Sequence, residues 1–105
     1  MKVGRTIAIG DIHGCAIAFD LLLDSIALQP EDTVITLGDY IDRGNDSKGV
    51  IDRLIALHKK GQLIPLKGNH EIMLLEARQS QEEERQWRKY GGEITLKSYV
   101  SAKKM

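Results

Sequence analysis

Three short apolar runs, each followed closely by a glycine and a polar residue, constrain the fold of this sequence most strongly. Runs of this length and β-branched content are typical of buried strands that stop where a loop begins. The runs are residues 6–9, 33–37 and 62–66, and the polar residues behind them are Asp11, Asp39 and Asn69.

Amphipathic segments separate these runs. Residues 16–28 carry apolar side chains at helical spacing, and a second such segment follows the potential caps of residues 45–47 and ends near Lys59. A third helix is expected from Asn69 through Leu75. Because helical crossovers join parallel strands, the pattern predicts an α/β domain over residues 1–105, with a β-α-β-α-β-α core. Pro65 suggests that the third strand lies at a sheet edge.

The last quarter of the chain gives a weaker pattern. Residues 79–89 are strongly polar, which predicts a solvated helix or lobe that Trp87 and Tyr90 could anchor through their apolar faces. Two glycines then break this segment, and residues 94–100 fit no single type of element.

Composition excludes several classes of function. Fifteen basic and fifteen acidic residues cancel, so neither a nucleic-acid partner nor a membrane surface is expected. Cys15 is the only cysteine, which rules out an intrachain disulfide, and we expect a small packed thiol there. The sequence has no apolar stretch of signal-peptide or transmembrane length, and a cytoplasmic location is the expectation.

The first polar segment, Gly10-Asp11-Ile12-His13-Gly14, suits a metal ion. Alternate residues of an extended segment point the same way, so the Asp11 carboxylate and the His13 imidazole can reach one point. A carboxylate with an imidazole suits manganese, iron or zinc.

The other two segments add phosphate and proton chemistry. Asp39 directly follows a strand and can bridge two metals, while Arg43 can fork onto phosphate oxygens. Asn69 offers an amide oxygen to a metal, and His70 can transfer a proton near neutral pH. Each motif alone is weak, because such residues more often form loops, turns or surface salt bridges. Three of them in order, each behind a strand, rarely coincide by chance.

Together, the blocks in residues 10–14, 38–44 and 68–71 resemble the signature of the phosphoprotein phosphatases, the serine/threonine phosphatases within the calcineurin-like metallophosphoesterases. The later Trp87, Gly91-Gly92 and Thr95 resemble the equivalent region of bacterial members. The resemblance implies part of a metallophosphoesterase sandwich. It also implies that family members continue further, with two more metal-binding histidines, a second phosphate-binding arginine and a second sheet.

Residue roles follow from the same resemblance. It implies two divalent metal ions, with manganese favoured over iron or zinc, and hydrolysis by a hydroxide that bridges them. His70 would protonate the leaving oxygen while Asp42 orients its ring. The implied metal ligands are Asp11, His13, Asp39 and Asn69, and the implied phosphate-binding residue is Arg43. His58, at a helix end, is expected to be a solvated or capping histidine.

The function expected from the resemblance is a metal-dependent phosphatase that acts on phosphomonoesters, with phosphoserine and phosphothreonine in proteins favoured over small phosphoesters. Two alternatives remain open. The chain could be a half-domain that binds metal or phosphate and turns over feebly, or a hydrolase of dinucleoside polyphosphates. An incomplete core would also leave one sheet face or edge without its partner layer and favour association with another chain.

Overall fold

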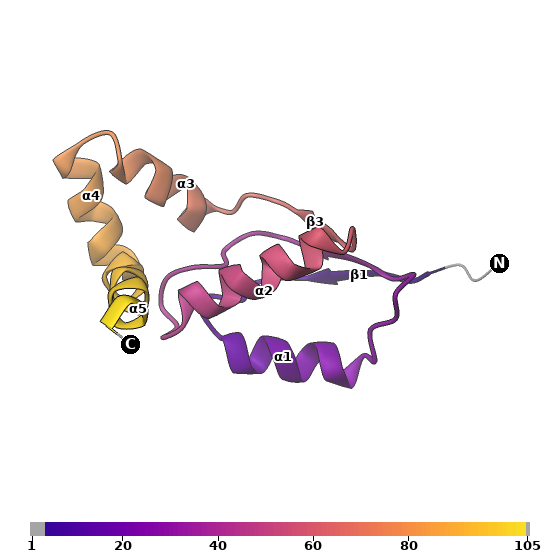
Figure 1. Ribbon diagram of the computed structural model, residues 1–105. Coiled ribbons are helices and arrows are strands. Elements are labelled where there is room, and N and C mark those ends of the chain that lie inside the picture. Colours follow the sequence, from indigo (N-terminus) through magenta and orange to yellow (C-terminus); the bar gives the residue numbers. More distant parts are fainter. Residues whose placement is uncertain (1–3, 105) are drawn as a thin grey trace.

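A computed structural model describes residues 4–104 as an α/β structure built on a small parallel sheet (Figure 1). The sheet has three strands in the order β1-β2-β3, and they are Thr6–Ile9, Thr33–Thr36 and Leu63–Pro65. Ile9 pairs with Thr36, and Thr36 pairs in turn with Pro65, so the carboxyl ends of all three strands lie at one edge. The predicted strands and their parallel direction are confirmed, and Pro65 lies in an edge strand.

Two helices connect the strands and cover one face of the sheet. They are α1 (Ala16–Ser25) and α2 (Ser47–Lys59). Right-handed crossovers between successive neighbouring strands place both helices on the same side. The core between the two layers contains Ile9, Val34 and Leu63 from the strands, Phe19 from α1, and Val50, Leu54 and Leu57 from α2.

The ends of these helices follow local sequence signals. Asp46 caps α2, because its Oδ1 accepts from the backbone N–H of Gly49 at 2.9 Å. His58 and Lys59 lie in the last turn of α2, where cations are favoured. The first helix ends at Ser25 rather than at residue 28, because Ala27 adopts a φ of 50°. No helix in residues 4–104 is long and apolar enough to cross a membrane.

The opposite face of the sheet is apolar and open. Ala8 is exposed, Ile35 is half-buried and Ile64 is 50% exposed, and these three residues lie side by side in the register. Leu37 and Leu66, just beyond the strands, are about as exposed as Ile64. Within the described residues this face therefore lacks a covering layer, as the sequence predicted.

The helices after β3 extend from the carboxyl edge of the sheet, at the end of the molecule away from the N-terminus (Figure 1). They are α3 (Asn69–Ala77), α4 (Gln81–Trp87), the π-helical turn η1 (Arg88–Gly92) and α5 (Glu93–Lys104). We call residues 81–100 the C-terminal arm. The segment without a predicted type is thus helical, and α5 packs against α2.

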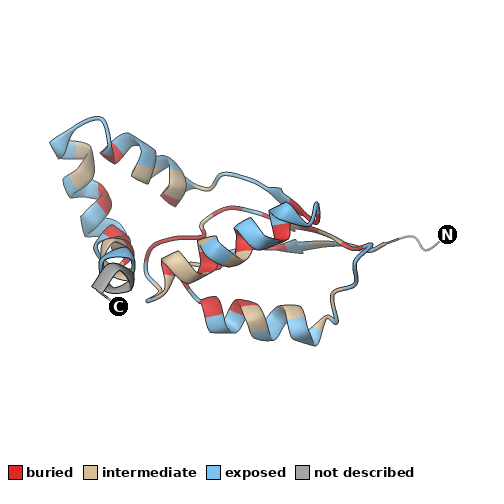
Figure 2. Cartoon of the chain, in the orientation of Figure 1, coloured by how far each residue is buried: buried red, intermediate tan, exposed pale blue. Residues whose placement is uncertain are grey.

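Burial in the C-terminal arm differs from the prediction at one aromatic residue. Trp87 is buried and anchors the arm as expected, whereas Tyr90 is 58% exposed. The chain bends at Tyr90 and Gly91, because Gly91 adopts a φ of 117° that breaks the helix. This bend leaves Tyr90 exposed. Figure 2 shows the surface of the arm as largely exposed, whereas residues 40–42 of the loop between β2 and α2 are buried.

Candidate metal centre

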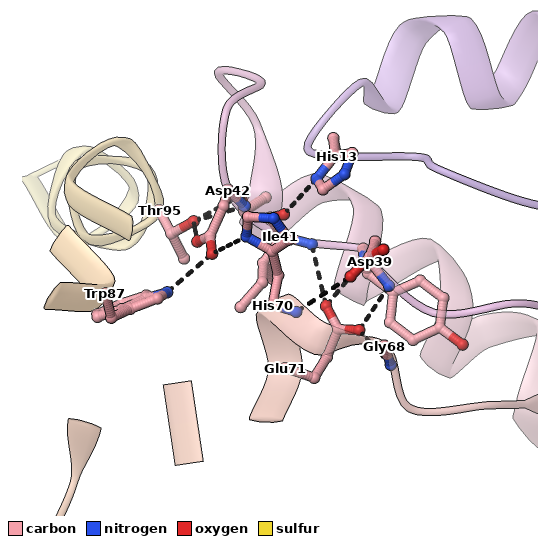
Figure 3. A network of polar contacts seen from close by, with 11 residues as sticks. His13, Asp39, Ile41, Asp42, Gly68, His70, Glu71, Trp87 and Thr95 are labelled. Atoms are coloured by element: carbon pink, nitrogen blue, oxygen red, sulfur yellow. Dashed lines mark hydrogen bonds and ion pairs between the residues drawn. The ribbon is translucent and has the colours of Figure 1, made fainter. Parts of the chain in front are cut away.

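The loops behind the strands bring three potential metal ligands together at the carboxyl edge of the sheet. His13, Asp39 and His70 each offer a ligand atom, and these atoms lie within 4.8 Å of one another. The two imidazole rings meet edge to face, with their centroids 4.8 Å apart (Figure 3). One residue comes from each of the three polar segments, so the parallel sheet brings all three segments together at this edge.

A backbone carbonyl fixes the orientation of the His13 ring. Its Nδ1 lies 2.9 Å from the carbonyl oxygen of Ile41. Because a carbonyl can only accept, Nδ1 carries the hydrogen and Nε2 keeps its lone pair. Histidine ligands of metals are usually held in this way.

A buried carboxylate fixes the His70 ring. Nδ1 of His70 lies 2.9 Å from Oδ2 of Asp42, which confirms the contact predicted from the sequence. The indole N–H of Trp87 donates to the same oxygen at 2.8 Å. Since this oxygen acts as an acceptor, Nδ1 of His70 is the donor, and Nε2 remains available to the site.

Glu71 joins the second and third loops, a role that the motif reading did not assign. Its carboxylate accepts from the backbone N–H groups of Asp39 at 2.6 Å, Tyr40 at 2.8 Å and Gly68 at 2.9 Å. The backbone N–H of His70 in turn donates to Oδ1 of Asp39 at 3.0 Å. Glu71 is the third residue of α3, where glutamate often reaches back to the helix start, and this position is the signal that could have revealed it.

Tyr40 ties the same loop to the end of β3. Its hydroxyl contacts Oγ1 of Thr36 at 2.8 Å and donates to the carbonyl oxygen of Leu66. Burial raises the pKa of the phenol, so the hydroxyl stays a donor across the neutral range. The loop that carries Asp39 is therefore fixed to the end of its own strand, β2, and to the segment just after β3.

The backbone of the site is strained. Gly38, at a φ of 98°, faces Gly68 so closely that a Cβ on either residue would overlap the other loop. Five residues other than glycine also have positive φ values at this edge, a conformation that costs on the order of 1–3 kcal/mol and clusters at functional sites. They are Asp11, His13, Asp39, Asp42 and Arg43.

The remaining predicted site residues lie around this group. Asp11 follows β1 and is exposed, but it is not among the three ligands that come together; it borders a small pocket with Phe19 and Leu22. Asn69 is the exposed first residue of α3. Arg43 is exposed, and no hydrogen bond of its guanidinium is found within residues 4–104. The ligand roles of Asp11 and Asn69 stay predictions.

Two further sequence expectations have clear outcomes. His58 is exposed at the end of α2, so its reading as a solvated histidine is confirmed. The prediction of a packed thiol is wrong, because Cys15 is exposed at the start of α1. The position just before a helix faces solvent here, since Ala16 and Phe19 provide the buried face of α1.

The donor set fits a divalent transition metal. The His13 imidazole and the Asp39 carboxylate suit manganese, iron or zinc. Both rings are oriented through Nδ1, which leaves two Nε2 atoms free near the Asp39 carboxylate. A metal held by His13 and Asp39 would keep coordination positions open for a water or a phosphate oxygen, and His70 would stay free to transfer a proton.

Comparison with known proteins places the chain among phosphoesterases. A family model described as calcineurin-like phosphoesterase matches residues 4–103. A solved structure assigned provisionally as a diadenosine tetraphosphatase superimposes with a TM-score of 0.64 and 29% identity, over 88% of this chain and 40% of that one.

Curated relatives carry two kinds of name. The symmetrical bis(5'-nucleosyl)-tetraphosphatase of Acidovorax sp. (strain JS42) is 44% identical over 70 residues, which are 66% of this chain and 24% of the relative. Serine/threonine-protein phosphatase 1 of Salmonella typhimurium is 40% identical over 73 residues, which are 69% of this chain and 32% of the relative. The chain thus spans about a quarter to a third of the length of these relatives.

Proposed function

Because the chain belongs to the calcineurin-like phosphoesterase family, we propose that it carries the metal- and phosphate-binding site of a hydrolase that cleaves symmetrical dinucleoside tetraphosphates. The grouping of His13, Asp39 and His70 within 4.8 Å carries this proposal. The tetraphosphatase names of several relatives and of the matched structure support the substrate class. The alternative weighed from the sequence is therefore better supported than the protein-phosphatase reading.

Hydrolysis of phosphoserine and phosphothreonine is the second candidate. Its support is the 40% identity with a serine/threonine-protein phosphatase. Both reactions place a phosphoryl group at the same site, and they differ in the leaving group: a nucleoside diphosphate in one case and a side-chain alkoxide in the other.

Different residues of this chain would bind the phosphate, transfer the proton and hold the metal in either reaction. Arg43 is exposed beside the site, and its guanidinium can donate two parallel hydrogen bonds to phosphoryl oxygens. His70 presents Nε2 to the site and, when protonated on both ring nitrogens, would give the Nε2 proton to the leaving oxygen while Nδ1 stays bonded to Asp42. Asp39 and His13 would hold a divalent metal, which when bound polarises phosphoryl oxygens and acidifies a water molecule.

Analysis of the reaction products tests the proposal. The chain is incubated with Mn²⁺ and diadenosine tetraphosphate, and in parallel with a phosphothreonine peptide, and nucleotides and phosphate are separated and quantified. Two ADP per substrate consumed, with loss of activity in Asp39→Asn, would support the tetraphosphatase proposal. Phosphate release from the peptide with intact dinucleotide would favour the second candidate, and a lack of both reactions would contradict the proposal for this chain.

A further inference from the structure

We propose that Trp87 and Thr95 of the C-terminal arm are positioning residues that hold Asp42, and through it His70, in the orientation that proton transfer needs. This inference rests on the proposed function, because His70 matters only if a leaving oxygen is protonated. Neither residue is near the ends of the strands in sequence, since Trp87 and Thr95 lie 45 and 53 positions from Asp42.

The Asp42 side chain receives its hydrogen bonds from two sides. Trp87 Nε1 donates to Oδ2 at 2.8 Å, and Thr95 Oγ1 donates to Oδ1 at 2.6 Å (Figure 3). The Thr95 hydroxyl also accepts from the backbone N–H of Asp42 at 2.8 Å. The Asp42 side chain is fully buried, so no water takes the place of these donors.

These contacts matter because an aspartate side chain does not fix its own orientation. Its terminal torsion is broad, so the carboxylate plane is set by the groups that donate to it. His70 supplies only one of three donor groups, and the other two come from the C-terminal arm. If the arm contacts were lost, the carboxylate plane could turn and the His70 ring would turn with it.

The arm also contacts the backbone that carries Asp42 and Arg43. The backbone N–H of Arg43 donates to the carbonyl oxygen of Gly91 at 3.4 Å. A Cβ at Gly91 would lie 3.2 Å from Cγ of Arg43 and 3.3 Å from Cβ of Asp42, and the φ of 117° already disfavours any side chain there. Gly91 thus allows the arm to approach the strained loop closely.

Attachment of the arm and orientation of Asp42 can be separated experimentally. Ser98 accepts from the backbone N–H of Lys48 at 3.0 Å, which fastens the arm to α2 without touching Asp42. Leu96 packs against the core as well. Removing the single indole N–H of Trp87 should therefore leave the arm attached while it removes one of the two hydrogen bonds to Oδ2 of Asp42.

Four variants test the inference. Trp87→Phe removes the N–H but keeps an aromatic ring, and Thr95→Val removes the hydroxyl at nearly constant volume. Thr95→Ser keeps the hydroxyl and is the conservative rescue, while Ser98→Ala removes an arm contact that does not reach Asp42. Thermal unfolding shows which variants are folded, and Trp87→Phe with Thr95→Ser still decides the question if Thr95→Val does not fold.

The first readout requires neither metal nor activity. NMR of the ¹⁵N-labelled, metal-free chain at one fixed pH follows the Nδ1–H proton of His70. We expect a hydrogen-bonded resonance, slow to exchange with water, in the wild type, Thr95→Ser and Ser98→Ala. In Trp87→Phe and Thr95→Val its exchange should accelerate by about 10-fold or more.

The second readout is catalytic. With Mn²⁺ and a phosphothreonine peptide, whose alkoxide leaving group needs a proton, Trp87→Phe should lower kcat roughly 10- to 100-fold, the range expected for a misplaced catalytic group, with KM unchanged. The loss with diadenosine tetraphosphate should be much smaller. Unchanged His70 proton exchange in folded Trp87→Phe would overturn the inference, as would an equal acceleration in Ser98→Ala. If the wild type lacks activity, the proposed function fails while the NMR measurement still decides whether the arm holds Asp42 and His70.

Discussion

The His70 ring and the Asp42 carboxylate lie 28 positions apart in the sequence, yet Nδ1 of the ring is 2.9 Å from Oδ2 of the carboxylate. The parallel sheet makes this contact possible, because it brings the loop after β2 and the start of α3 to one edge. The pair has the arrangement of a histidine whose proton position is fixed by a buried acid. Its consequences can be measured.

Replacement of His70 by asparagine should affect substrates according to their leaving group. An alkoxide needs protonation far more than a phosphate or a nitrophenolate does, so loss of a general acid costs about 10²- to 10⁴-fold on a phosphoserine peptide. The loss should be much smaller on p-nitrophenyl phosphate and diadenosine tetraphosphate. The measurement is kcat/KM for the three substrates, with bound manganese determined in each sample. Equal losses on all three, accompanied by loss of metal, would show that His70 acts as a ligand instead.

Glu71 should stabilise the site through its contacts with backbone N–H groups. Glu71→Gln replaces one carboxylate oxygen by an NH₂ group, which cannot accept a hydrogen bond. The backbone N–H groups that donate to that oxygen then lose their acceptor, and each unsatisfied group costs about 1–3 kcal/mol. Glu76→Gln, on the exposed side of the same helix, is the matched control. Urea unfolding should show a clear decrease in the free energy of unfolding for Glu71→Gln and almost no decrease for Glu76→Gln. Similar unfolding midpoints for the two variants would contradict the bridging role of Glu71.

Alanine substitutions at two glycines with positive φ distinguish the cost of steric overlap from the cost of backbone strain. Gly61, at a φ of 74°, has no atom within 4 Å of its Cβ position, so Gly61→Ala should cost only the left-handed penalty of about 1–2 kcal/mol. At Gly38 the Cβ would lie 2.5 Å from Cα of Gly68, so Gly38→Ala adds overpacking of about 1–3 kcal/mol. Denaturant titrations should give Gly38→Ala a much lower free energy of unfolding than Gly61→Ala, and manganese affinity should fall only in Gly38→Ala. The reverse ranking would contradict the close approach of the two loops.

The ionisation of Asp32 should make the free energy of unfolding depend on pH. The hydrogen bond from Arg5, at 2.6 Å, and then the backbone N–H of Gln29 hold the pKa of this carboxyl well below its ordinary range. Because unfolded aspartate titrates near pH 3.9, the stabilisation is complete above about pH 4 and is lost as the pH falls toward the lower folded pKa. Asp32→Asn should therefore be less stable at pH 7 and should lose less stability between pH 5 and pH 2.5.

The control for that experiment is Asp24→Asn, which changes an exposed aspartate of α1. It should retain the acid dependence of the wild type. An unchanged slope of unfolding free energy against pH in Asp32→Asn would show that another carboxyl group controls stability at low pH.

The fold was predictable because its local signals agree with one another. Apolar runs, the Asp46 cap and the cations at the end of α2 all point to the observed strands and helices. The segment after Gly91 gave no clear pattern, since α5 is held by contacts with α2 that are distant in sequence. Tyr90 was misjudged because a bend at one residue decides which way a side chain faces, and periodicity does not locate such a bend.

The site was predictable only in part for the same reason. Residue type and position behind a strand singled out His13, Asp39 and His70, which the structure brings together, but assigned His70 to proton transfer and not to a metal. The contacts of Trp87 and Thr95 with Asp42 depend on where the C-terminal arm docks, which no spacing in the sequence encodes. Five strained backbone positions likewise arise from tertiary contacts between loops.

Binding of manganese by the metal-free chain tests the central claim most directly, and the three histidines of the sequence report on it. Paramagnetic Mn²⁺ broadens nearby NMR resonances, so substoichiometric additions should remove the ring signals of His13 and His70 first. The His58 signal, from the far end of α2, should persist, and Asp39→Asn should abolish the selectivity while Asp24→Asn retains it. Uniform broadening of all three histidines, or loss of the His58 signal before the other two, would contradict a metal centre at the carboxyl edge of the sheet.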